Sequence, residues 1–165
     1  MMILLSLLVF LFVSFFGYWV HRGLHKKFSG PFGKSHKTHH EIMYPVTDFK
    51  SDKYRSAGKD SSLIFFAVIS IPIVALPFLL SFLGILSLVK ALLIVGQMIF
   101  WGWLHNYIHD AFHINNHWLS RVPVVKIWFN RLIDLHFGHH CDVQKNFGIF
   151  FFGWDRLFGT YMNNP

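Results

Sequence analysis

Long uncharged stretches alternate with shorter polar segments along this chain of 165 residues. Residues 2–20 contain no charged side chain, a second uncharged stretch runs over 61–89, and a third apolar stretch, 91–104, follows Lys90. About 20 apolar residues are enough for a helix to cross a bilayer. The pattern predicts an all-α integral membrane bundle with about three transmembrane helices, at about 2–20, 62–83 and 88–109.

The second stretch is longer than one span requires, and it contains Pro72, Pro77 and Gly84. We therefore expect a helical hairpin that turns near Gly84–Lys90. The prolines are tolerable because neighbouring helices can satisfy the carbonyls that they free. The first stretch has a rival interpretation as a cleaved signal peptide, which needs a positively charged start and a small-residue cleavage site. It begins Met-Met-Ile and ends Tyr-Trp-Val, so we expect a retained helix.

Three spans would place residues 21–60 and 105–165 on one side of the membrane. Nine Lys and Arg residues lie in the first of these segments and five in the second, so that only Lys90 of the fifteen lies on the other side. Positive loops mark the cytoplasmic face. We expect an integral protein of a bacterial inner membrane or the endoplasmic reticulum, with interfacial helices, one of them over 123–137, forming a cap on the cytoplasmic face.

Composition supports lipid as the solvent for much of the chain. Hydrophobic residues make up 53% and charged residues 14%, against about 25% charged in typical soluble proteins. The formal charge of +7 does not indicate a nucleic-acid-binding protein, because the basic residues flank apolar spans and form no patch on a soluble core. The single cysteine, Cys141, allows no intrachain disulfide. The length favours one domain over 1–165.

The histidines fall into a repeated pattern. Each polar segment carries an H-x3-H pair and then an H-x2-H-H cluster. On a helix, residues i, i+3 and i+4 share a face, so each box should aim two or three imidazoles at one point. Imidazole suits iron, zinc, copper and nickel, and ten such ligands can fill about five positions on each of two metals. The candidate ligands are His21, His25, His36, His39, His40, His105, His109, His136, His139 and His140.

The third box is ambiguous. His105, His109 and His113 lie on successive turns of one predicted helix. Three roles are open for His113: a metal ligand, a hydrogen-bond partner of a ligand, or a histidine at the end of the helix. His117 is expected to be solvated or to cap a helix. Carboxylates near the boxes could orient ligand imidazoles. These are Asp110, Asp142 and Glu41.

The boxes are similar to those of a known family. His21–His25 and His36–Glu41 resemble the H-R-x-x-H and H-K-x-H-H-E boxes of sterol-modifying enzymes, and Ile108–His113 resembles an I-H-D segment of sterol C5-desaturases. Asn146–Gly148 and Trp154–Tyr161 are similar to an N-Y-G…W-D-R-L-F-G-T-Y ending. Over roughly residues 17–162 the chain resembles the fatty acid hydroxylase / sterol desaturase superfamily of membrane di-iron oxygenases.

The resemblance implies a helical membrane fold, two iron ions held by the ten histidines, and O2-dependent hydroxylation or desaturation of a lipid (sterol, fatty acyl or carotenoid). It implies no catalytic residue beyond the metal ligands. Many members have four or more transmembrane helices, and bacterial carotenoid hydroxylases have H-x4-H as their first box, which leaves the substrate subclass open. The chain has no G-x-G-x-x-G fingerprint, so a separate cytochrome b5-like or ferredoxin-like electron donor is expected.

Two other classes of protein compete with the oxygenase. A membrane metal-binding or metal-transport protein would place its ligands within the spans, near the bilayer midplane. A haem protein would use one or two facing histidines and leave most of the ten unexplained. Neither alternative matches histidines that lie at or beyond the ends of uncharged spans.

Overall fold

The structure, a computed structural model, describes residues 2–26, 29–55 and 61–163. Within these ranges every named element is helical, which confirms the predicted all-α class. The helices are α1 (Met2–Leu24), α2 (Gly30–Thr38), α3 (Ser61–Phe82), α4 (Leu88–Phe112), α5 (Pro123–Cys141) and α6 (Gly153–Leu157). A π-helical turn η1 (His39–Met43) and the 3-10 turns η2 (Val46–Asp48) and η3 (Trp118–Ser120) complete the set.

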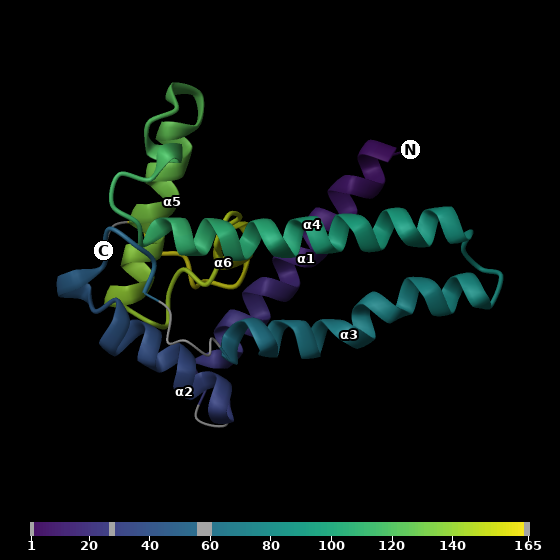
Figure 1. Cartoon of the computed structure of the whole chain (residues 1–165), viewed down its shortest axis with the longest axis horizontal. Coiled ribbons are helices and arrows are strands. Elements are labelled where there is room, and N and C mark those ends of the chain that lie inside the picture. Colours follow the sequence, from purple (N-terminus) through teal and green to yellow (C-terminus); the bar gives the residue numbers. More distant parts are fainter. Residues whose placement is uncertain (1, 27–28, 56–60, 164–165) are drawn as a thin grey trace.

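Helices α3 and α4 run side by side and form the predicted hairpin (Figure 1). The chain reverses at Gly84, whose φ of +72° is a conformation that glycine adopts at no steric cost. Ser87 then caps α4, because its hydroxyl accepts a hydrogen bond from the backbone N–H of Lys90 at 3.4 Å. The hairpin predicted near Gly84–Lys90 is therefore confirmed.

Two helices are long and apolar enough to cross a membrane, Ile3–Leu24 and Leu88–Phe112. Only 28% and 11% of their most apolar windows are buried inside the structure, so most of their apolar surface is available to lipid. Both helices continue three or four residues beyond the predicted spans. The third predicted span coincides with α3, whose side chains are described over Ser70–Phe82, and its membrane crossing stays a prediction.

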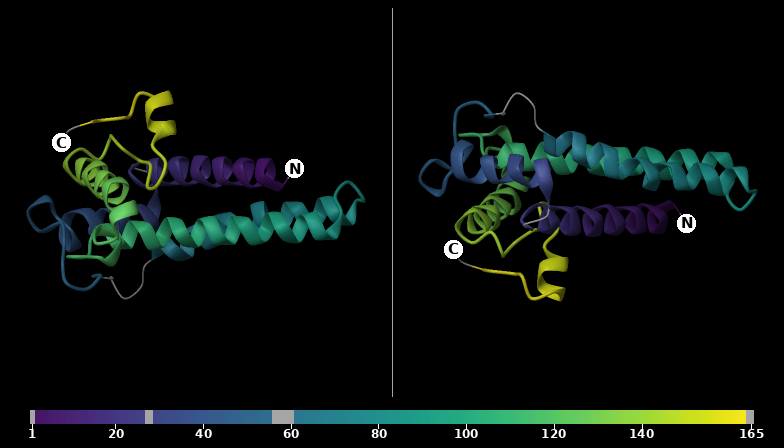
Figure 2. Two further views of the ribbon diagram at one scale, coloured as in Figure 1. Left: turned by 90° about the horizontal axis from the view of Figure 1, so that it is seen from above. Right: turned by 90° about the horizontal axis from the view of Figure 1, so that it is seen from below.

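The polar segments gather at one end of the long helices. The N-terminus of α1 and the α3–α4 turn lie at one end, and α2, α5 and the C-terminal segment lie at the other (Figure 2). A core between the end of α4 and α5 packs this second end, with Phe112 and Phe129 fully buried. The ends of α1, α4 and α5, where the histidine boxes lie, are therefore brought together.

Candidate metal centre

The folded chain assembles nine histidines into two groups, which come from α1, α2–η1, α4 and α5. The ligand nitrogens within each group lie within 4.8 Å of one another. The first group is His21, His25, His36, His40 and His139. The second group is His39, His109, His113 and His136.

Backbone carbonyls orient four of the imidazoles. A carbonyl only accepts, so each contacting Nδ1 carries the proton, and the lone pair of that histidine lies on Nε2. Metal-binding histidines are usually held in this way. The pairs are His21 with Phe147 O at 2.7 Å, His139 with Lys145 O at 2.6 Å, His140 with Tyr44 O at 2.8 Å and His113 with Phe49 O at 2.9 Å.

Within each group, Nε2 atoms lie about as far apart as two nitrogens that bind the same metal ion. In the first group His25 lies 3.1 Å from His139 and 3.0 Å from His36, measured between Nε2 atoms. In the second group the Nε2 atoms of His113 and His136 lie 3.2 Å apart. Two nitrogens bound at right angles to one ion, each at about 2.1 Å, lie about 3.0 Å apart. The spacing within both groups fits a bound cation.

Several buried imidazole nitrogens have no hydrogen-bond partner among the described residues. They include Nε2 of His21, His39 and His140. A buried polar atom without a partner costs about 1–3 kcal/mol, which a metal ion in the groups would relieve. The donor set therefore fits two metal ions.

Burial favours the neutral form of at least four of the imidazoles. Desolvation is the largest cause that lowers the pKa of His25 to about 4 and of His140 to about 3. It also lowers the pKa of His36 and His139 well below the ordinary value, helped by neighbouring histidines. Neutral imidazole is the form that binds a metal.

The structure corrects the expectation that each box aims at one point. His39 and His40 are consecutive, yet they belong to different groups, because neighbouring residues on a helix point about 100° apart. His136 likewise joins the second group while His139 joins the first. His140 lies between the groups, with ring centroids 4.0 Å from His40 and 5.3 Å from His39.

The third box also differs from the expected pair. His113 lies in the second group with His109, whereas His105 is in neither group. The His105 ring instead lies against α1, where a Cβ on Gly17 would come within 3.1 Å of its Nε2. His113, in contrast, is the C-cap residue of α4 and is fully buried among the other histidines. We therefore replace His105 by His113 in the proposed ligand set.

Three carboxylates were expected to orient imidazoles. Among the described residues, only Asp110 of these three contacts a histidine ring, with its Oδ1 3.3 Å from Nδ1 of His109. Glu41 pairs with Lys37 on the surface, and Asp142 accepts from the backbone N–H of Gln144. The expectation that His117 caps a helix is confirmed, because it is the N-cap residue of η3 and its Nδ1 accepts from the backbone N–H of Leu119.

Residues outside the boxes complete the centre, and the sequence reasoning missed them. Tyr44 is fully buried and stacks on His113 with ring centroids 4.0 Å apart. The carbonyls that hold His21 and His139 flank Asn146. The N-x-G element of the tail was the one signal in the sequence that pointed to this turn.

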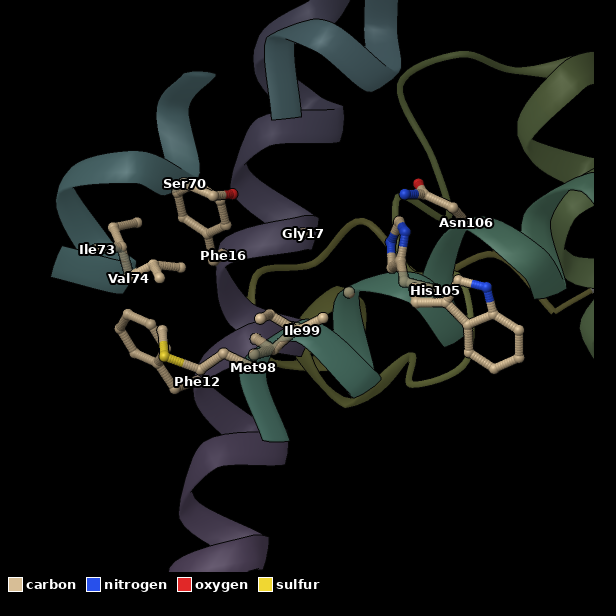
Figure 3. A pocket seen from close by; sticks show the side chains of 13 residues that line it. Phe12, Phe16, Gly17, Ser70, Ile73, Val74, Met98, Ile99, His105 and Asn106 are labelled. Atoms are coloured by element: carbon tan, nitrogen blue, oxygen red, sulfur yellow. The ribbon is translucent and has the colours of Figure 1, made fainter. Parts of the chain in front are cut away.

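An apolar cavity of about 380 Å³ adjoins the centre, between α1, α3 and α4. Its wall ends at Gly17 and His105, one helical turn before His21 and His109 of the two groups. Figure 3 shows His105 and Asn106 at one side of the cavity, and Ser70 with mostly apolar side chains at the other. The apolar part includes Phe12, Val13, Phe16, Ile73, Val74, Met98 and Ile99.

The fatty acid hydroxylase family model matches residues 6–160 of this chain. The chain belongs to the fatty acid hydroxylase family. It is 28% identical over 155 residues to a probable Delta(7)-sterol 5(6)-desaturase of Neurospora crassa, covering 93% of this chain and 37% of that protein. It is 25% identical over 149 residues to the very-long-chain aldehyde decarbonylase GL1-4 of Oryza sativa subsp. indica, covering 90% and 22%. No solved structure is significantly similar to it.

The match confirms the resemblance to the fatty acid hydroxylase / sterol desaturase superfamily. The chain spans little more than a third of the sterol desaturases that it matches and less of the decarbonylase. Its own substrate and reaction are therefore proposals.

Proposed function

We propose that this chain is a membrane-bound, non-haem di-iron oxygenase that hydroxylates or desaturates a lipid with O2 and external electrons. The observation that carries the proposal is the pair of adjacent imidazole groups, in which Nε2 atoms converge at 3.0–3.2 Å. Membership of the fatty acid hydroxylase family supports it. Two iron ions, when bound, supply the O2-derived oxidant that an unactivated C–H bond requires.

The histidines hold the two irons in this proposal. The five of the first group take one ion and the four of the second take the other, with His140 placed to reach either. Buried carbonyls fix the ring orientations, so the ligand geometry is formed before an ion binds. Burial of the groups also excludes water from the site.

The cavity between α1, α3 and α4 holds the lipid. It lies along helices whose exposed surfaces are apolar, so a chain from the bilayer reaches it without crossing water. His105 and Asn106 provide polar groups at one side of the cavity (Figure 3), and His105 lies one helical turn before His109 of the second group. A sterol, a fatty acyl chain and a carotenoid are the candidate substrates.

The membrane topology completes the proposal. α3 crosses the membrane as a third span with α1 and α4, and the histidine groups form a cap on the cytoplasmic face. The N-terminal half of α5 lies at the interface, because Val124, Ile127 and Trp128 expose 91%, 82% and 45% of their surface. A helix that exposes apolar side chains next to charged ones is suited to the headgroup region of a bilayer.

A separate cytochrome b5-like or ferredoxin-like carrier supplies the electrons. Residues 21–60 contain nine basic and four acidic residues, so an acidic carrier is steered to that face. Turnover with the physiological donor should fall as salt rises, and turnover that is independent of ionic strength would contradict the steering.

Metal content of the detergent-purified chain, expressed in iron-replete cells, tests the centre. We expect about two irons per chain by mass spectrometry, lost in a His39→Ala/His139→Ala double variant and retained in His117→Ala, which lies outside both groups. O2 consumption and lipid analysis of the expressing cells then identify the product. One metal or none in the wild type would refute the dinuclear oxygenase. Two metals without O2 uptake would favour a metal-binding or metal-transport protein.

A further inference from the structure

The turn at Asn146 presents two backbone carbonyls to two ligands of the first group. Lys145 O accepts from Nδ1 of His139 at 2.6 Å, and Phe147 O accepts from Nδ1 of His21 at 2.7 Å. The two histidines come from α5 and α1, and their ring centroids are 4.4 Å apart. One turn thus orients imidazoles from opposite ends of the chain.

Asn146 itself fixes this turn. It is fully buried, and its Nδ2 donates to the carbonyls of Leu135 at 3.0 Å and Met162 at 2.9 Å. Its Oδ1 accepts from the N–H of Met162 at 2.8 Å. Its φ of +52° is left-handed, which asparagine tolerates far better than a β-branched residue does.

Asp155 holds the other side of the turn. Its carboxylate is buried and accepts from the backbone N–H groups of Phe147 at 2.7 Å and Gly148 at 2.8 Å, and from the hydroxyl of Thr160 at 2.8 Å. A Cβ at Gly148 would meet a carboxylate oxygen of Asp155 at 2.8 Å, so only glycine allows this approach. The peptide that presents Phe147 O is therefore clamped on its N–H side.

We propose that Asn146 and Asp155 are positioning residues for the first histidine group. They hold the two carbonyls in place, and the carbonyls in turn fix the proton on Nδ1 and aim Nε2 of His21 and His139 into the group. The inference rests on the proposed metal centre and assigns a role within it. Outer partners of metal-binding histidines are typically worth about 10–100-fold in metal affinity.

The test measures iron release from the loaded, detergent-purified chain to an excess of chelator. In Asp155→Asn, an amide NH2 group replaces one carboxylate oxygen and faces the N–H and O–H groups that donate to Asp155. In Asn146→Val, the β-branched side chain disfavours the left-handed backbone at this position. In both we expect one iron per chain to leave at least about tenfold faster while the other leaves at the wild-type rate. Asn146→Gly keeps the backbone conformation and loses only the side-chain hydrogen bonds, so its effect should be smaller.

The chain offers a matched control in Asn116, which also has a positive φ, of 51°, but is exposed. Asn116→Val should release both irons at the wild-type rates. The unfolding temperature of each metal-free variant separates positioning from general stability, and the less disruptive Asn146→Gly serves if Asn146→Val does not fold.

Wild-type release rates in Asp155→Asn and Asn146→Gly, from a chain that holds two irons, would overturn the positioning role and leave the oxygenase intact. Equal acceleration of both irons, in step with a lower unfolding temperature of the metal-free chain, would reduce these residues to structural ones. A wild-type chain without metal would overturn the proposed function itself.

Discussion

Replacing His113 by alanine is expected to remove one metal per chain, whereas the same replacement of His105 leaves both. His113 is fully buried, donates from Nδ1 to Phe49 O and places Nε2 at 3.2 Å from Nε2 of His136. His105 lines the apolar cavity and belongs to neither histidine group. The two variants therefore distinguish a metal ligand from a residue that lines the cavity, although His105 and His113 are each four residues away from His109.

The magnitude follows from these contacts. An outer partner of a ligand is worth about 10–100-fold in affinity, so loss of a ligand should weaken the second metal by at least about 100-fold, or about 2.7 kcal/mol. The metal-free His113→Ala chain should also lose about 1–3 kcal/mol of stability, since the buried carbonyl of Phe49 loses its donor. His105→Ala should change lipid turnover without changing the metal content.

The assay is iron content per chain after dialysis against a graded series of chelator concentrations, with urea unfolding of the metal-free forms alongside. Two irons retained by His113→Ala, together with loss of one iron in His105→Ala, would refute the reasoning. That result would restore the pair of ligands that the H-x3-H spacing alone suggests.

Three further outcomes are expected. Gly102 lines the cavity and has open space beside it, so the larger side chain of Gly102→Leu should lower lipid turnover at least about tenfold. Gly96→Leu, on the exposed side of α4, should leave turnover unchanged. Equal turnover in the two variants would contradict the cavity as the lipid site. The metal-free chain should lose stability in urea as the pH falls below 6.5 toward 4. In that window the unfolded chain binds protons that folded His25 and His140 do not, at up to about 1.4 kcal/mol per pH unit for each; equal urea midpoints at pH 7 and pH 5 would contradict this. Cys141, which is exposed, should react with a membrane-impermeant maleimide from the cytoplasmic side only, and labelling of intact cells would reverse the topology.

Local sequence patterns predicted the hairpin and the gathering of the histidines. The turn depends on Gly84 and on Ser87, which caps the next helix, and the histidines lie where apolar stretches end. The choice between His105 and His113 was not predictable, because both share the helical register of His109. What decides it is the packing of α4 against Gly17 of α1, a contact between residues far apart in the sequence.

The acceptors that orient the histidines were hidden for a different reason. Every residue has a backbone carbonyl, so no residue type marks the four that hold imidazoles. Most residues of 44–55 are polar or charged, which is typical of a surface stretch, yet Tyr44 and Phe49 are buried against the histidines. Hydrophobicity within so short a segment did not reveal which of its residues turn inward.

An all-imidazole donor set has a consequence for electron transfer. Both groups consist of neutral side chains, so they would cancel none of the charge on two bound divalent ions. Neutral ligands favour the reduced state of iron, as replacement of thiolates by histidines does in iron–sulfur centres, where it raises the reduction potential by hundreds of millivolts. The centre proposed here should therefore accept electrons from a mild one-electron donor and should not require a low-potential carrier.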